Sequence, residues 1–241
     1  MSSPEKPGSL TGKKAQVEDM FNAIARRYDF LNHFLSLGFD IYWRKKAVSL
    51  LKTNHPQKIL DIATGTGDLA IESLSVHPQK VLGIDISEKM LHIGKEKIKR
   101  RKIEDIIELT KADAEHLPFA NNTFDAITVG FGVRNFTSLE KGLKEMNRVL
   151  KQDGKAVILE FSNPKKFPVK QLYNFYFLVL LPLLGRFISK HNFAYSYLPQ
   201  SVTSFPDGKD FINIFEKAGF NSTKYIPLSF GIVSIYIGNK T

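Results

Sequence analysis

The feature that most constrains the fold is an alternation, starting at Lys58, between short β-rich runs and longer stretches with helical periodicity. Each apolar run is followed by turn residues and then by an amphipathic segment, so helices have to join consecutive strands. Strands joined in that way lie parallel in one sheet, and the helices cover its two faces. The sequence therefore predicts an α/β fold built on a mostly parallel sheet.

Seven runs have the composition and length of strands, and the segments between them read as helices. Ser87 offers an N-cap to the helix that follows the second strand. Only a few residues separate the last two strands, which predicts an antiparallel hairpin at the end of the sheet. The expected strands cover residues 58–63, 80–86, 106–110, 124–129, 155–161, 222–226 and 232–237, and the expected helices 69–76, 87–101, 138–150 and 208–217.

A chain of 241 residues, 43% of them apolar, suits one large domain better than two. We expect a flexible tail over residues 1–14, which is rich in Gly, Pro and Ser, and a single domain over 15–241. Within that domain we expect N-terminal helices over 15–52, the main part of the sheet over 58–161, a helical, aromatic-rich insert over 164–200, and a C-terminal helix and hairpin over 208–238.

The charge balance and the cysteine count narrow the class of protein. The 34 basic and 24 acidic residues give a net charge of +10, which favours an anionic partner such as nucleic acid, an acidic lipid surface or a phosphorylated ligand. The chain has no cysteine, so disulfides, thiolate nucleophiles and cysteine metal sites are excluded. The N-terminus lacks the apolar stretch of a secretory signal, and we expect a cytoplasmic protein.

The run DIATGTGD at residues 61–68 has the character of a nucleoside-binding turn between a strand and a helix. Gly65 and Gly67 let the backbone turn tightly and approach a ligand, and the following helix presents free N–H groups. Asp85 ends the next strand twenty positions after Gly65, where a carboxylate can accept hydrogen bonds from both ribose hydroxyls. The glycine loop and this carboxylate together predict a nucleoside site.

Two aspartates favour S-adenosylmethionine over a dinucleotide, although Gly65, Gly67 and Ala70 also satisfy the dinucleotide pattern G-x-G-x-x-G/A. Asp61 at the loop entrance would repel a pyrophosphate but attract a sulfonium and an amino group. Asp113 follows another strand and can accept a hydrogen bond from an adenine amino group. A plain tight turn would explain the glycines and leave the aspartates unexplained.

Longer blocks of sequence resemble the quinone-biosynthesis C-methyltransferases, that is, the demethylmenaquinone and 2-polyprenyl-6-methoxy-benzoquinol methyltransferases. The resemblance spans nearly the whole chain after the tail. The matching blocks are VEDMFNAIARRYDFLNHFLSLGFDIYWR (17–44), DIATGTGD (61–68), DISEKML (85–91), DAEHLPFANNTFDAITVGFGVRNF (113–136), RVLKQDGKAVILEFSNP (148–164) and YLPQSVTSFP (197–206).

The resemblance implies a class I S-adenosylmethionine-dependent methyltransferase fold, which is Rossmann-like, and methyl transfer to a ring carbon of a prenylated quinol. Demethylmenaquinol is the expected acceptor; a polyprenyl methoxybenzoquinol or another small hydrophobic acceptor is the alternative. The expected catalytic residues are Tyr28, Arg134 and Asn135. The expected cofactor-binding residues are Asp61, Gly65, Thr66, Gly67, Asp85, Ile86, Asp113 and Ala114.

The chain departs from the family pattern at several positions. Asp40 and Tyr236 stand where members often have His, and Asp113 stands where many have Asn. Gln152 and Asp153 replace a Pro-Gly pair, which lies outside the expected site. Gly130 removes a side chain that in some members is a serine touching the cofactor. The Asp113 change keeps an acceptor, so its predicted adenine contact is retained.

The predicted chemistry needs alignment of a ring carbon with a methyl group more than it needs a strong base. Arg134 stays protonated, so it can stabilise a developing quinolate oxygen or orient a water but cannot act as an ordinary base. Asn135 can hold the other oxygen, and Tyr28 can bond a ring hydroxyl. His33, His116 and His191 lack metal-ligand spacing, so we expect no metal site.

The insert combines many aromatic side chains with a basic rim that includes Lys165, Lys166 and Lys170. It suits either an ordinary cap over the sheet or a lid that admits a prenyl tail and touches an anionic membrane at its inner face. Its apolar run over 172–184 is shorter than the roughly 20 residues of a membrane-spanning helix. An RNA methyltransferase would use the basic charge but not these aromatic residues, so no nucleic acid is expected.

Overall fold

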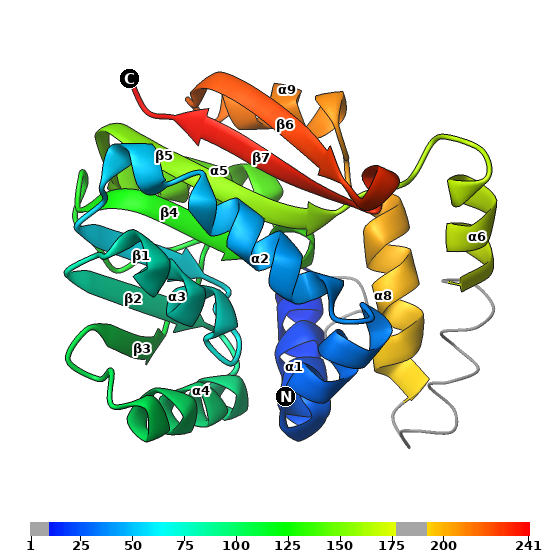
Figure 1. Cartoon of the computed structure of the whole chain (residues 1–241), viewed down its shortest axis with the longest axis horizontal. Helices are drawn as coiled ribbons and strands as arrows, with labels where there is room; N and C mark the ends of the chain where they lie inside the picture. Colours follow the sequence, from blue (N-terminus) through cyan, green and yellow to red (C-terminus); the bar gives the residue numbers. More distant parts are fainter. Residues whose placement is uncertain (1–9, 177–191) are drawn as a thin grey trace, which may run out of the picture.

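The computed structural model describes residues 10–176 and 192–241 and shows a seven-stranded mixed sheet between layers of helices (Figure 1). The strand order is β3-β2-β1-β4-β5-β7-β6. The strands are β1 Lys58–Ile62, β2 Lys80–Asp85, β3 Ile107–Lys111, β4 Phe124–Gly130, β5 Leu150–Phe161, β6 Asn221–Leu228 and β7 Val233–Asn239. The helices are α1 Leu10–Leu35, α2 Phe39–Ser49, α3 Asp68–Glu72, α4 Glu88–Arg101, α5 Leu139–Val149, α6 Val169–Phe175, α8 Asn192–Ser204 and α9 Lys209–Lys217.

The predicted strand pattern is confirmed. Strands β1 to β5 pair in parallel, and β7 pairs antiparallel with both β5 and β6. The Ser87 side chain accepts a hydrogen bond from the Met90 amide at 3.3 Å, as expected of an N-cap. Strand β5 is longer than predicted because Leu150 pairs with Phe124 ahead of a break in register.

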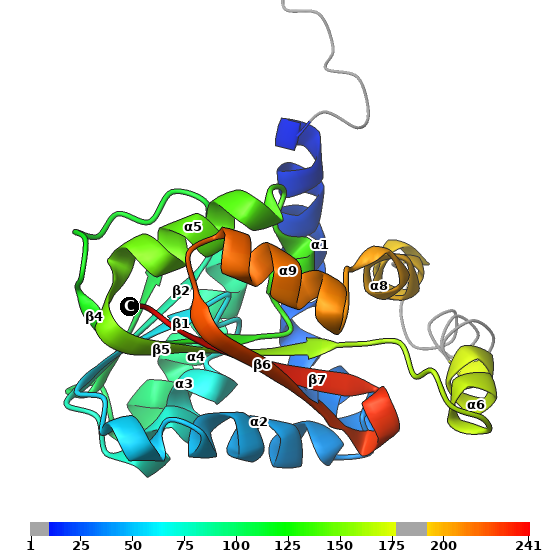
Figure 2. The ribbon, with the colours of Figure 1, turned by 90° about the horizontal axis from the view of Figure 1, so that it is seen from above.

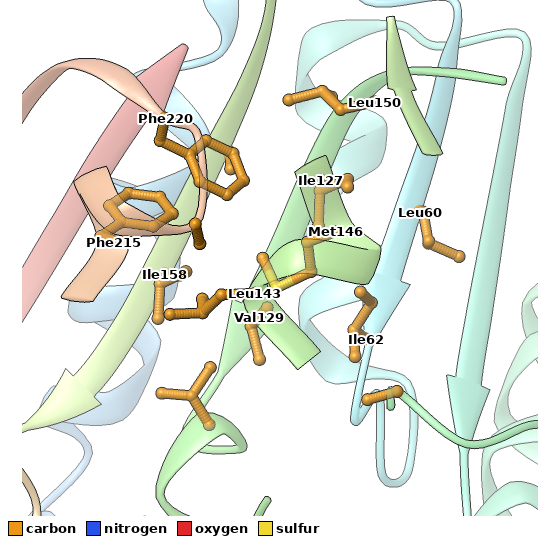
Figure 3. Close-up of a cluster of buried hydrophobic side chains, with 14 of the residues drawn as sticks. Leu60, Ile62, Ile127, Val129, Leu143, Met146, Leu150, Ile158, Phe215 and Phe220 are labelled. Carbon is orange, nitrogen blue, oxygen red and sulfur yellow. The ribbon is translucent and has the colours of Figure 1, made fainter. Parts of the chain in front are cut away.

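Each face of the sheet carries its own apolar core, because neighbouring residues of a strand point to opposite faces. In β5, Ala156 and Ile158 face one core and Val157 and Leu159 the other. Seen from above, α5 and α9 cover one face and α2 and α3 the other (Figure 2). Figure 3 shows the first core, where Leu143 and Met146 of α5 and Phe215 of α9 meet strand residues.

The N-terminal helix begins earlier than the sequence suggested. Residues 10–14, expected in the flexible tail, are the first turns of α1, and that part of the prediction is wrong. The reason lies in tertiary contacts, since Lys13 donates to the Phe136 carbonyl at 2.8 Å and Lys14 forms an ion pair with Asp113. Residues 1–9 lie outside the described part of the chain.

The predicted insert is seen in part, since its residues 177–191 lie outside the described chain. Helices α6 and α8 stand beyond the end of the sheet toward which β5 points, close to the end of α1 (Figure 1). Leu31 of α1, Tyr173 of α6 and Val202 of α8 form a small apolar cluster there. Within residues 10–176 and 192–241, no helix has the length and apolar character to cross a membrane.

Candidate active site at the carboxyl ends of the strands

Two cavities meet at the edge of the sheet where the parallel strands end, the usual place for ligands in such folds. The smaller, a cleft, lies between α1 and the segments that follow β1, β2, β3 and β4. The larger has a volume of about 580 Å³ and lies between α1, α2, α6, α8 and the 3-10 turn η5 Ser229–Gly231. Phe21, Tyr28 and Phe131 line both, so these side chains mark the junction.

The glycine loop forms one wall of the smaller cleft. Gly65 and Gly67 have φ of 57° and 83°, a region that favours glycine. The Asp85 carboxylate holds the loop, accepting from the Gly65 amide at 2.9 Å through Oδ2 and from the Ser87 amide at 2.8 Å through Oδ1. Burial raises the pKa of Asp85 above its usual value, against these hydrogen bonds. Asp85 and Ile86, two of the residues expected at the cofactor, both line the cleft.

Asp61 lies behind the loop and does not line the cleft. Its two carboxylate oxygens accept hydrogen bonds from the hydroxyls of Thr64 at 2.5 Å and Thr128 at 2.7 Å. The side chain is fully buried, and this burial raises the pKa of Asp61 to about 6. Asp61, which the sequence analysis expected at the cofactor, is thus held by two threonine hydroxyls and is not among the residues that line the cleft.

Two more residues of the predicted cofactor set also lie off the cleft wall. Thr66 donates to Oδ1 of Asp29 at 2.5 Å and accepts from Lys97 at 3.0 Å, so its hydroxyl is bound to α1 and α4. Gly67 caps the N-terminus of α3 instead of lining the cleft. These residues shape the loop.

The buried Asp61 predicts a pH-dependent stability. A carboxyl whose pKa is raised by folding stabilises the fold at low pH, and this contribution is lost as pH rises through its folded pKa of about 6. As the pH rises from 4 to 7, the free energy of unfolding of Asp61→Asn is therefore expected to increase by roughly 3 kcal/mol relative to that of the parent protein. Urea unfolding of both proteins across that range measures the gain.

A matched control has the opposite sign. Asp125 is partly buried, but hydrogen bonds from Lys151 and from the amides of Gln57 and Lys58 outweigh that burial and lower the pKa of Asp125. Asp125→Asn should therefore be less stable than the parent protein at pH 7, and this difference in the free energy of unfolding should disappear at low pH. Parallel stability curves for Asp61→Asn and the parent protein would show that Asp61 does not titrate as described.

Asp113 and Ala114, two more of the residues expected at the cofactor, also line the cleft. Asp113 follows β3; its Oδ1 accepts from the Glu115 amide at 3.0 Å, and its Oδ2 faces His116 at 3.1 Å and pairs with Lys14. Burial works against ionisation, but these contacts hold the pKa of Asp113 below its usual value. Lys14 was not predicted for the site, since nothing in the sequence places the start of α1 beside this cleft.

Arg134 lies at the larger cavity, in the 3-10 turn η3 Val133–Asn135 after β4. Its Nη1 donates to Oε1 of Glu160 at 2.6 Å and to the Phe131 carbonyl at 2.5 Å. Glu160, in β5, is fully buried, and burial raises its pKa although Arg134 lies beside it. Glu160 was not predicted for the site; the signal in the sequence was an acidic residue inside an apolar strand.

The other two predicted catalytic residues flank the junction. Tyr28 lines both cavities, and burial raises its pKa. Asn135 lines the cleft; its Oδ1 accepts from the Tyr197 hydroxyl of α8 at 3.1 Å, and its Nδ2 donates to the Phe131 carbonyl at 3.4 Å. Tyr28, Arg134 and Asn135 are thus brought together from α1 and η3 around the point where the cavities meet.

Comparison with known proteins identifies the family. The model of the ubiE/COQ5 methyltransferase family matches residues 10–240. The chain belongs to this family. It is 48% identical to the demethylmenaquinone methyltransferase of Bacteroides fragilis, over 98% of this chain and 97% of that one. It is 44% identical to the ubiquinone/menaquinone biosynthesis C-methyltransferase UbiE of Geotalea uraniireducens, over 96% and 99%.

The fold agrees with this assignment. A SAM-dependent methyltransferase from Aquifex aeolicus superposes with a TM-score of 0.56 at 19% identity, covering 77% of this chain and 82% of that one. At that identity the likeness concerns the fold alone. Membership of the ubiE/COQ5 family makes the chain a methyltransferase with S-adenosyl-L-methionine as its methyl donor, which confirms the resemblance seen in the sequence.

The residues that depart from the family pattern lie in different parts of the structure. Tyr236 is buried in the core, where its hydroxyl oxygen accepts from the Gly208 amide at 2.8 Å, and it lines neither cavity. Asp40 lines the larger cavity and is bound to Ser36 at 2.6 Å and Arg44 at 2.8 Å. Gly130 lines the cleft. Asp40 and Gly130 can therefore affect ligands, whereas Tyr236 supports the start of α9.

Proposed function

We propose that this protein transfers a methyl group from S-adenosyl-L-methionine to a ring carbon of a prenylated quinol, with demethylmenaquinol as the acceptor. The observation that carries the proposal is the junction, at Tyr28, of a cleft whose lining includes the carboxylates of Asp85 and Asp113 with a large apolar cavity, since the donor carries polar groups and the acceptor is mostly apolar. Relatives named demethylmenaquinone methyltransferase support the choice of acceptor. A benzoquinol acceptor is the second candidate, favoured by relatives named for both quinones.

The residues of the cleft suit the donor. Among the described residues, a Cβ built on Gly65 would meet only the Tyr28 ring, at 3.8 Å, so the backbone can approach a ligand there. Asp85 suits the two ribose hydroxyls, and the apolar Ile86 and Ala114 suit the faces of an adenine ring. Asp113 is then the acceptor for the adenine amino group. When bound, the donor supplies an electrophilic methyl group on its sulfonium.

The chain's own residues then orient the acceptor and stabilise its charge. The apolar walls of the larger cavity hold the ring and its tail, so that the reacting carbon faces the junction. Arg134 stabilises the quinolate oxygen that forms when a ring hydroxyl gives its proton to water. As the ring carbon takes up the methyl group, this negative charge passes from the oxygen into the ring, and loss of the proton on that carbon to water restores the aromatic quinol. Asn135 and Tyr28 hold the other oxygen and the ring hydroxyl. Alignment and charge stabilisation, rather than a strong base, account for the reaction.

Trp43 reports directly on whether a quinone enters the larger cavity. It is the single tryptophan of the chain, is buried against that cavity, and donates to the Ser229 hydroxyl at 2.8 Å. Quinones quench indole fluorescence on contact, so a prenylated naphthoquinone is expected to quench Trp43 in a saturable way. Titration of the protein beside free tryptophan measures this. Quenching no stronger than that of free tryptophan would contradict the assignment of the cavity.

Exposed apolar side chains surround the mouth of this cavity. Leu37, Leu172 and Phe230 line it and yet are exposed by 83%, 66% and 85%. More exposed apolar side chains lie on the same elements or beside them: Phe30, Phe34, Phe39, Ile41, Tyr42, Phe167 and Phe175. Lys165 and Lys166 precede α6, and Lys170 lies in its first turn. We propose that this face contacts an anionic membrane surface, from which a prenylated acceptor can reach the cavity.

Vesicle binding tests this contact. Sedimentation with phosphatidylglycerol vesicles is expected to capture the protein, and Leu37→Asp or Phe230→Asp should weaken capture about tenfold. Tyr225→Asn, at an exposed ring on β6, is the matched control and should not change it. Equal capture of all four proteins, or capture by neutral vesicles alone, would refute the assigned face.

A further inference from the structure

A charge pair is buried beneath the larger cavity. The side chain of Arg134 is 7% exposed and that of Glu160 is 0% exposed, and Nη1 lies 2.6 Å from Oε1. Glu160 comes from the carboxyl end of β5 and Arg134 from η3, so the pair joins the sheet to the turn that follows β4. Buried ion pairs of this kind add little stability over a well-packed apolar pair, which raises the question of what this one does.

Glu160 holds Arg134 at more than one point. Its Oε1 accepts from Nη1 and from the Phe161 amide at 2.9 Å, while its Oε2 faces the backbone amide of Arg134 at 3.3 Å. The guanidinium carbon lies 5.3 Å from the centre of the Phe161 ring. The carboxylate therefore fixes both the backbone of the turn and the direction of the guanidinium.

This arrangement leaves Arg134 with a buried donor that has no partner among the described residues. Its Nε is buried and has no hydrogen-bond partner within the described chain, although Arg134 lines the larger cavity. An unsatisfied buried N–H is costly, and the cost is recovered when a ligand oxygen accepts from it. The three phenols of Tyr28, Tyr173 and Tyr197 lie within electrostatic reach of the same guanidinium. Arg134 is therefore the central cation of a site lined with aromatic residues.

We infer that Glu160 is a positioning residue for methyl transfer, which turns Arg134 so that its Nε–H donates to a ring oxygen of the quinol. This inference rests on the proposed function, and it assigns to Glu160 the placement of the guanidinium on which that function depends. Glu160 also balances the charge of the guanidinium, so that an otherwise unpaired cation does not have to be kept in an apolar cavity. Without Glu160 the guanidinium is free to leave the position in which Nε meets the ring.

The test is Glu160→Gln, an isosteric change that keeps an acceptor oxygen but removes the charge. We expect kcat with the quinol to fall about 100-fold, as for a group misplaced by about 1 Å, while the dissociation constant of S-adenosyl-L-methionine changes less than twofold. Glu145→Gln is the matched control, because Glu145 also pairs with an arginine, Arg148 at 2.7 Å, but lines neither cavity. Its turnover should stay within twofold of the parent protein.

A double-mutant cycle separates positioning from a merely structural role. In an Arg134→Met background, Glu160→Gln should lower turnover by less than a further threefold, because both residues act through one interaction. A radiolabelled donor makes this low turnover measurable. An equal loss in both backgrounds, or near-parent turnover of Glu160→Gln, would overturn the inference while the proposed function stands. No turnover of the parent protein with either quinol would instead overturn the proposed function, and the inference with it.

Discussion

Replacing Arg134 with methionine is expected to lower turnover with the quinol by about 1000-fold and to leave the affinity for S-adenosyl-L-methionine nearly unchanged. The reason is that Arg134 lines the larger cavity and not the cleft, so its charge acts on the acceptor. Methionine keeps much of the volume of the side chain but provides no donor. Initial rates with labelled donor, together with equilibrium binding of the donor, measure the two effects separately.

A folding defect has to be separated from this effect. Removing Arg134 leaves Glu160 buried without its cation, which costs about 3–5 kcal/mol in comparable pairs. The double variant Arg134→Met with Glu160→Gln removes that cost and should melt above the single variant while remaining inactive. Arg134→Lys keeps a positive charge but has no Nε, and its turnover should be lower than that of the parent protein by about 30-fold or more. Turnover of Arg134→Met within tenfold of the parent protein would contradict the role of Arg134.

The second large effect is expected at Asp85, where alanine should weaken binding of S-adenosyl-L-methionine about 50-fold. Both oxygens of this carboxylate hold backbone amides at the cleft, those of Gly65 and Ser87. Alanine therefore removes the support of the glycine loop as well as the acceptor proposed for the ribose. Calorimetric titration with the donor or its demethylated product measures the affinity.

Asparagine at position 85 separates the two parts of that effect. It keeps one acceptor oxygen and the shape of the side chain, so Asp85→Asn should lose less affinity than Asp85→Ala. Asp125→Asn, which alters a carboxylate at the other end of the sheet, is the control and should bind the donor normally. If Asp85→Ala bound within threefold of the parent protein, Asp85 would have no part in the nucleoside site.

The arrangement of the sheet could be predicted because it depends on local pattern. Apolar runs bounded by turn residues gave the strands, and the short link between the last two gave the hairpin. The position of Asp85 at the end of β2 followed from the same reasoning, since carboxyl ends of parallel strands share one edge. The order of the elements was thus predicted correctly, and the candidate site lies at the edge of the sheet where the sequence placed it.

The direction of individual side chains could not be predicted in the same way. Strand alternation puts Asp61 on the face opposite Leu60 and Ile62, but the sequence does not say that Thr64 and Thr128 bind its carboxylate there. Glu160 was missed because its partner lies 26 positions away on another element. Lys14 was placed in a tail, although its contact with Asp113 spans 99 positions. Such contacts depend on packing between distant segments.

Methyl transfer to a prenylated quinol can be measured with a labelled donor and the two candidate acceptors. The purified protein is incubated with methyl-labelled S-adenosyl-L-methionine and, separately, with reduced demethylmenaquinone and the reduced polyprenyl methoxybenzoquinone. The account predicts that label enters the naphthoquinol and that Arg134→Met prevents it. Label in the benzoquinol alone would reassign the acceptor, and no label in either quinol would contradict the account.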